Sequence, residues 1–472
     1  MSDTSMLLPS LQARFKSRSM GTKLIVVCGL ALAMTIPALF VGGLVDERTQ
    51  RAADVTREIG SHVGGPQTFL GPTLAIPYTV PAPSAGSRPE HGIYLVFPVQ
   101  GGATVKTRTQ ERRRSLFKVP VFEAELRFDA AFDLTGAPLA APLGAVLDWS
   151  RAELVVGVSD ARGALADGAI TVDGKTDTVA PADSIDGLSF DSNGNRNERT
   201  PLTLFGVAAA ELAPPAAKFQ VSTALRFSGA QRIAVLAYGK TTHLNIEGDW
   251  PNPSFDGGFL PVKRTVSPQG FSGEWVVPWI ARGIPAEGRN ASVAGLDATA
   301  LGVSFVELAD PYQSVNRSLK YVLLFLGLLF LSYFIFEVTT GKRVHPAQYL
   351  LVGVAQIIFY LLLLSFAERI GFDFGFLLAG GATVILLAAN AGWIFASRSQ
   401  GLRALIGFGL LYALIYMLLR LEDDALLVGA IASFLAVAAA MYFTRGIDWY
   451  SQLAATGAHE PQTTLPSPKD PA

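Results

Sequence analysis

The sequence predicts a membrane α-helical bundle of six transmembrane helices, one before and five after a large antiparallel β-rich domain. Half of the 472 residues are hydrophobic and only 16% are charged, whereas a typical soluble domain carries roughly 25% charge. The apolar residues collect at the two ends of the chain. The middle holds most of the charge and alternates with a period of two, which is typical of half-buried strands.

Six apolar runs are long enough to cross a bilayer, because a hydrocarbon core of about 30 Å takes about 20 helical residues. The predicted membrane segments are 24–44, about 319–336, about 349–366, about 374–395, about 404–419 and 425–443. The first run is either a secretory signal or an anchor. Its apolar stretch of about 21 residues exceeds a signal core of about 7–15, which favours an uncleaved anchor. Pro37 is expected to kink it, as membrane helices tolerate.

Charge in the loops predicts the orientation, because basic residues collect on the cytoplasmic side. The basic residues assigned to that side are Arg14, Lys16, Arg18, Lys23, Lys342, Arg343, Arg398, Arg403 and Arg445. Acidic residues gather in the outer loops. The predicted parts are a cytoplasmic N-terminus (1–23), the first helix (24–44), an exported domain (45–318), a five-helix bundle (319–443) and a partly disordered cytoplasmic tail (444–472).

The exported segment contains two clear examples of strand alternation. Apolar residues alternate with charged ones in 122–128 and with mostly polar ones in 219–227. Both segments end in Leu-Arg-Phe, which leaves an internal duplication open. We predict an antiparallel, sandwich-like domain with few helices. Residues 47–59 are polar and rich in Arg and Ala, and we expect them to form a helix between the anchor and the domain.

Three stretches of the exported domain are candidate binding segments, and each has a structural alternative. Ser159–Gly163 either holds a ligand with its Asp and Arg or forms a capped turn with an ion pair, which we favour. The basic cluster of 111–114 and Lys118 either meets anionic headgroups or an acidic partner, or is a solvated strand edge, which we favour. The stretch 250–261 holds three prolines and three aromatic residues, so we expect an irregular loop, either for binding or folded onto the core.

Signatures of enzymatic chemistry are missing from the sequence. One cysteine, Cys28, permits no internal disulfide or Cys-based metal site, and the five histidines are not spaced for metal binding. No nucleophile-elbow, zinc-protease, phosphate-loop or dinucleotide motif is present. We expect no enzyme activity, catalytic residue, cofactor or metal and, with a net charge of −1, no nucleic-acid partner.

The predicted membrane segments carry no charge near their centres, which argues against ion-coupled transport. Gln356 and Asn390 are the deep, strongly hydrogen-bonding residues, and we expect them to bond between helices. At the ends of two segments, a contact of Glu337 with His345 or Arg343 is geometrically reasonable across a short hairpin.

Several long motifs resemble those of the CreD family of inner-membrane proteins, the "cell envelope integrity" family. The likeness is densest in the last third of the chain, in 307–325, 345–353, 359–372, 421–427 and 444–450. In the exported domain it includes 71–78, the 159–163 turn and the 250–261 stretch. It spans 24–450 but gives no match in 161–217.

The resemblance implies a six-crossing inner-membrane protein with a large periplasmic domain, linked to envelope integrity and envelope-stress responses. It implies no catalytic residues, since the family's molecular activity is not established. The leading hypothesis is a non-enzymatic protein in the lipid bilayer whose periplasmic domain binds an envelope protein or another envelope component. The alternative is a transporter or flippase-like protein for a hydrophobic envelope substrate, and a membrane-embedded hydrolase ranks last.

Overall fold

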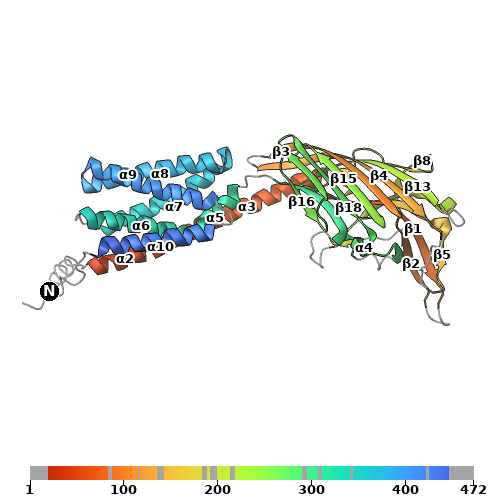
Figure 1. Ribbon diagram of the computed structural model, residues 1–472, viewed down its shortest axis with the longest axis horizontal. Coiled ribbons are helices and arrows are strands. Elements are labelled where there is room, and N and C mark those ends of the chain that lie inside the picture. Colours follow the sequence, from red (N-terminus) through yellow and green to blue (C-terminus); the bar gives the residue numbers. More distant parts are fainter. Residues whose placement is uncertain are drawn as a thin grey trace, which may run out of the picture. The chain divides into compact units, whose positions relative to one another are not determined.

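The computed structural model divides the chain into a helical unit and a β-rich unit (Figure 1). The β-rich unit is Arg51–Leu308, and the helical unit combines Met1–Gln50 with Ala309–Ala472. The residues described are 20–82, 88–114, 117–135, 143–182, 189–191, 199–212, 218–289, 295–306, 311–340, 344–420 and 425–445. Most of the predicted cytoplasmic N-terminus and nearly all of the predicted tail lie outside these residues.

The helical unit is built from long apolar helices. Their bounds are α2 Met20–Ala33, α3 Thr35–Val63, α5 Pro311–Lys320, α6 Val322–Thr340, α7 Pro346–Ile370, α8 Phe372–Phe395, α9 Arg398–Arg420 and α10 Ala425–Thr444. Each of the six predicted membrane segments falls mainly within these helices. The first falls on α2 and α3, and the other five on α6 to α10.

Four helices among the described residues are long and apolar enough to span a membrane: Lys23–Val63, α7, α8 and α9. The pair α5 and α6 is bent by 58° and makes a fifth span if counted as one. The apolar stretch of α10, Leu427–Ala439, is shorter. The count of six therefore stays a prediction, and several membrane-crossing helices are what the structure supports.

A break separates α2 from α3 at Met34, three residues before Pro37. Proline has no N–H with which to reach the carbonyl four residues earlier, here that of Ala33. The helix nevertheless resumes and continues to Val63, so it contains the polar segment 47–59. The predicted helix over that segment is confirmed.

The β-rich unit contains two large sheets. Its strands are β1 Gln67–Val80, β2 Glu90–Val96, β3 Gln100–Arg114, β4 Phe117–Asp133, β5 Val146–Leu147, β6 Glu153–Val158, β7 Ala169–Val172, β8 Lys175–Thr178, β9 Ala180–Pro181, β10 Ser189–Asp191, β11 Arg199–Pro201, β12 Thr203–Ala208, β13 Lys218–Ala230, β14 Arg232–Leu236, β15 Thr241–Gly248, β16 Pro253–Gly257, β17 Lys263–Ser267, β18 Gly270–Val277, β19 Glu287–Arg289 and β20 Ala300–Phe305. Short helices include α4 Trp279–Arg282.

The first sheet follows the order β16-β20-β14-β1-β6-β12-β9, with β2, β5 and β19 attached at β1 and β2. The second follows β17-β18-β15-β3-β4-β13-β7-β8. Most ladders are antiparallel, as predicted. Two are parallel, β1 with β14 and β3 with β15. Both join strands that are far apart in the chain, and such a separation leaves room for the crossover that a parallel pair needs.

The predicted alternation is confirmed in β4 and β13. These strands are neighbours in the second sheet, where Leu126 opposes Leu225. Their inward residues, such as Phe128 and Phe227, are buried, and the charged residues between them are exposed. One apolar core collects side chains from both sheets.

One of the places where the chain passes between the two sheets lies between β14 of the first sheet and β15 of the second. There the Arg282 Nε donates to the Ala237 carbonyl at 2.7 Å, and the Ala237 N–H donates to Thr299 Oγ1 at 3.2 Å. The Tyr238 hydroxyl donates to the Gly102 carbonyl at 2.6 Å. Burial raises the pKa of Tyr238 and lowers the pKa of Arg282 to about 10. Buried side chains thus hold the backbone of the crossover in place.

Candidate functional site

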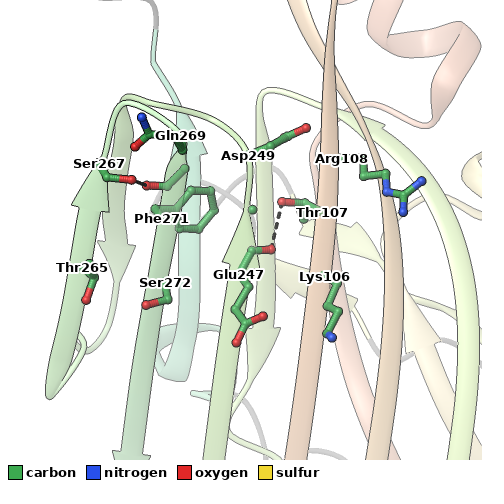
Figure 2. Close-up of a pocket in the computed structure, with 12 residues that line it drawn as sticks. Lys106, Thr107, Arg108, Glu247, Asp249, Thr265, Ser267, Gln269, Phe271 and Ser272 are labelled. Atoms are coloured by element: carbon green, nitrogen blue, oxygen red, sulfur yellow. Dashed lines mark hydrogen bonds between the residues drawn. The ribbon is translucent and has the colours of Figure 1, made fainter.

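An open polar groove of about 500 Å³ lies on the outer face of the second sheet (Figure 2). It crosses β3, β15, β18 and β17. Its lining is Lys106, Thr107, Arg108, Glu247, Gly248, Asp249, Thr265, Ser267, Gln269, Gly270, Phe271 and Ser272. Cations come from β3 and carboxylates from β15 and the residue after it, so the groove presents charges of both signs beside hydroxyl groups.

The register of the strands aligns these charges. Lys106 and Glu247 are partners in the parallel ladder of β3 and β15, and Figure 2 shows them on neighbouring strands. Asp249 Oδ1 accepts the Thr109 N–H at 2.8 Å, and the Thr107 hydroxyl donates to the Glu247 carbonyl at 3.2 Å. The backbone of the floor is therefore fixed, while the ends of Lys106 and Glu247 remain exposed.

Gly248 permits the close packing of this floor. A Cβ there would lie 2.2 Å from Thr107 Oγ1 and 2.6 Å from a ring carbon of Phe271. We expect Gly248→Ala to lower the free energy of unfolding by about 1–3 kcal/mol through overpacking. Thermal unfolding of the detergent-solubilised protein measures it. Gly102→Ala in the neighbouring strand is the control, because its nearest contact would be 3.7 Å; equal losses for both variants would contradict this account.

The Ser159–Gly163 segment forms a capped turn, as favoured from the sequence. Residues 161–163 are a short 3-10 helix, whose N-cap Asp160 accepts the Arg162 N–H at 3.0 Å. Asp160 also pairs with the Arg162 guanidinium at 2.6 Å. This hydrogen-bonded ion pair holds the pKa of Asp160 below its usual value. The Asp and Arg satisfy each other, so the turn offers little to a ligand.

Gln67 connects this turn to the rest of the β-rich unit. The side chain is fully buried, and its Nε2 donates to the carbonyls of Gly64 at 2.8 Å and Asp160 at 3.0 Å. The Ser159 hydroxyl donates to the Pro66 carbonyl and lies 3.3 Å from Gln67 Oε1. The Gln67 amide therefore adds to the backbone and Ser159 hydrogen bonds that join the start of β1 to the turn after β6.

Asp160→Asn should lower the free energy of unfolding by about 1 kcal/mol at pH 7, through loss of a charged cap. The folded-state pKa lies below the unfolded value near 3.8. The stabilisation is therefore present at neutral pH and is lost as the pH falls through the folded pKa. Thermal unfolding of both proteins between pH 7 and pH 3 should show the difference shrinking in acid. A difference independent of pH would count against the ion pair.

The basic cluster lies at the end of the β3–β4 hairpin, where the outer side of each strand pairs with no other described strand, so the favoured interpretation of a solvated strand edge is confirmed. β3 pairs with β15 only up to Thr107, and β4 pairs with β13 only from Val121, so the hairpin continues beyond both neighbours. Arg114 forms an ion pair with Glu58 of α3. The predicted exposure is confirmed, because the side chains of Arg113, Arg114 and Lys118 are 45–67% exposed.

The 250–261 stretch is partly regular, which corrects the expectation of an irregular loop. Residues 253–257 form β16, the edge strand beside β20. Proline is tolerated as the first residue of an edge strand, which Pro253 is. Trp250 is buried and donates to the Val306 carbonyl at 3.1 Å, and Phe255 packs against Trp275. Of the two interpretations, the structure supports the one in which the aromatic residues fold onto the core.

A buried carboxylate joins three helices of the helical unit. Glu337 of α6 is 2% exposed and accepts hydrogen bonds from Lys23 of α2, from the Val344 N–H at 3.1 Å and from the Tyr349 hydroxyl of α7 at 2.9 Å. Lys23 also donates to the Val344 carbonyl. The expected contact with His345 is wrong, because His345 caps α7 by accepting the Ala347 N–H. Arg343 lies outside the described residues.

The deep polar residues bond between helices, as predicted. The Tyr412 hydroxyl of α9 donates to Gln356 Oε1 of α7 at 2.5 Å. The Asn390 amide of α8 donates to the Tyr333 hydroxyl of α6 at 3.4 Å. Among the described residues, no group of three or more His, Cys, Asp or Glu could hold a metal ion.

Comparison with known proteins identifies the family. The family model described as "Inner membrane protein CreD" matches residues 19–450, which includes the stretch 161–217 that carries no motif resembling the family. The chain is 30% identical over 441 residues to the "Inner membrane protein CreD" of Escherichia coli (strain K12), covering 91% of this chain and 93% of that relative. On both findings, the chain belongs to the CreD family of inner-membrane proteins.

Proposed function

We propose that this protein supports cell envelope integrity without enzymatic activity, by binding an envelope component through its β-rich unit. The observation that carries the proposal is the polar groove of about 500 Å³ on the outer face of the second sheet. Its charges are carried on a fixed strand framework, and a rigid framework lowers the cost of ordering a bound partner.

The proposed topology places the β-rich unit in the periplasm and both termini in the cytoplasm. The basic residues that flank the apolar helices support it through the positive-inside rule. The proposed helix count is six, with α10 as the last crossing. A cysteine-accessibility map with a membrane-impermeant reagent tests both, using single cysteines at Arg127, at Arg398 and, beyond α10, at Ser451 after Cys28→Ser. Labelling of the second site and not the first in intact spheroplasts would refute the topology.

Complementation tests the role of the groove. Cells lacking the protein should survive a membrane-active detergent when they carry the wild type, but not when they carry Lys106→Glu with Arg108→Glu. The matched control is Arg127→Glu with Lys218→Glu, which reverses two exposed charges of the same sheet outside the groove lining. Full rescue by the groove variant would remove the groove from the proposal. Full rescue by a chain lacking residues 64–306 would show that the β-rich unit is not needed and would refute the proposal.

A second candidate function, movement of a hydrophobic envelope substrate, is favoured by one observation in the helical unit. A groove of about 380 Å³ runs between α7 and α8. Its lining is apolar except for Thr383 and Asn390. A hydrophobic substrate needs no buried charge. Liposomes containing the purified protein should then move a fluorescent phospholipid between leaflets, and Ala382→Trp in the groove should stop this. Leu377→Trp on the exposed side of α8 is the control. No movement by the wild type rejects this candidate.

A further inference from the structure

The second sheet ends in a strand whose outer side no described strand covers. β17 pairs only with β18 and is the first strand of its sheet. The unpaired backbone groups of such an edge are a template for another strand. Two other sheet ends carry prolines, which discourage pairing: Pro253 begins β16, and Pro181 ends the short β9.

The inner face of β17 presents a row of one basic and one apolar side chain. Val266 opposes Phe271, which belongs to the core, and Arg264 lies two residues before Val266 on the same face. Val266 is nonetheless 51% exposed. The core layer of the sandwich thus continues to the edge strand, where its last side chains are left uncovered.

The backbone of β17 offers its free groups at the same residues. Pro268 and Gln269 form a two-residue turn, so Ser267 and Gly270 are the hydrogen-bonded pair that closes the ladder. By the alternation of an antiparallel ladder, the N–H of Thr265 points to β18, and those of Arg264 and Val266 point outward. An added strand would find hydrogen-bond donors beside the uncovered row.

We infer that β17 is a docking edge for an extended segment of another protein, with an acidic and an apolar residue on the face that lies beside Arg264 and Val266. Main-chain bonds supply affinity in this mode of recognition, and alternate side chains supply specificity. Arg264 is exposed and makes no ion pair with any residue that the structure describes, so an acidic partner residue complements it. This inference rests on the proposed function and names the bound envelope component as a protein.

A second copy of the same chain is a poor occupant of this edge. An antiparallel pair of two β17 strands centred on Thr265 would place Arg264 of each copy opposite Val266 of the other, so neither arginine would meet an acid. A shifted register that sets Arg264 opposite Arg264 would bring like charges face to face, which destabilises the pairing. The charge on the edge therefore favours an acidic strand from a different protein.

Two labelled peptides test the inference on the full-length protein in lipid nanodiscs. One is Thr-Val-Thr-Glu-Thr-Val-Thr, and the other has Lys in place of Glu. By fluorescence anisotropy, the wild type should prefer the Glu peptide by up to about fivefold, as one cross-strand charge pair allows. Arg264→Glu should reverse this preference. Val266→Pro removes an outward N–H without touching the β18 ladder, and should weaken the binding of both peptides.

The control is Lys175→Glu on β8, the opposite edge of the same sheet, which should leave the preference unchanged. Equal binding of the two peptides, binding of neither, or an unchanged preference in Arg264→Glu overturns the inference. Complementation separates it from the proposed function. If Arg264→Glu rescues cells fully while the groove variant does not, the docking edge is refuted and the groove stands.

Discussion

Replacing Glu337 by alanine is expected to lower the free energy of unfolding of the helical unit by about 3–5 kcal/mol. Removing one member of a buried ion pair leaves the other charge without compensation, which is a cost of that size. Glu337 is 2% exposed and its partner Lys23 is 15% exposed. The Val344 N–H and the Tyr349 hydroxyl would lose their acceptor as well. Denaturation in mixed detergent micelles, followed by tryptophan fluorescence and circular dichroism, measures the change.

A double variant separates the burial of a lone charge from a general loss of packing. Lys23→Met with Glu337→Met removes both charges, and it should recover most of the stability that Glu337→Ala loses. Asp54→Ala breaks the exposed ion pair with Arg57 and should cost less than about 1 kcal/mol. If the double variant is as unstable as Glu337→Ala, the charge of Lys23 is not the cause.

Gln67→Leu should lower the free energy of unfolding of the β-rich unit by about 2–5 kcal/mol. The substitution fills the same buried space but leaves the carbonyl of Gly64 without this donor, and it leaves the carbonyl of Asp160 with only the Gly163 N–H, which is 3.3 Å away. Each unsatisfied buried polar group costs about 1–3 kcal/mol. Hydrogen exchange of the full-length protein, resolved by peptide, should show loss of protection at the start of β1 and around the 159–163 turn.

Thr73→Val is the matched control, because Thr73 is also buried in β1. Its hydroxyl bonds only with the carbonyl of Gly71, at 3.2 Å, so it connects no distant segments. We expect a smaller loss that stays near its own strand. If Gln67→Leu leaves the protection around 159–163 unchanged, the amide does not hold these two segments together.

The sequence reveals elements whose pattern depends on one-sided or complete burial. Phe122, Phe128 and Phe227 alternate with polar residues because each strand has one face in the core, and this period can be read without knowing the partner strand. The apolar helices are equally visible, since a helix long enough to cross a bilayer must be apolar along most of its length. The capped turn at Asp160 is local, and so it too could be predicted.

Contacts between distant segments could not be predicted. Lys23 and Glu337 are 314 residues apart, and nothing in their neighbouring residues marks them as a pair. Sequence reasoning proposed His345 and Arg343 because they are close along the chain. Likewise, the composition of 250–261 predicts irregular structure. That prediction fails because Pro253 lies at a sheet edge, and its position there depends on the pairing of β16 with β20. The docking edge at β17 depends on knowing which strand ends the sheet.

The strand order has a consequence for how the β-rich unit folds. β1 is made early, yet it pairs with β14, whose own partner β20 ends at Phe305. Pairings between residues so distant form slowly, because the loops between them must close first. β3 and β4, by contrast, follow each other in the chain and pair from Arg114 with Phe117 to Gln100 with Ala131. We therefore expect the second sheet to nucleate from this hairpin. β1 can pair early with β2 and β6, but its first residues, Gln67–Phe69, find their parallel partner only after β14 has been synthesised.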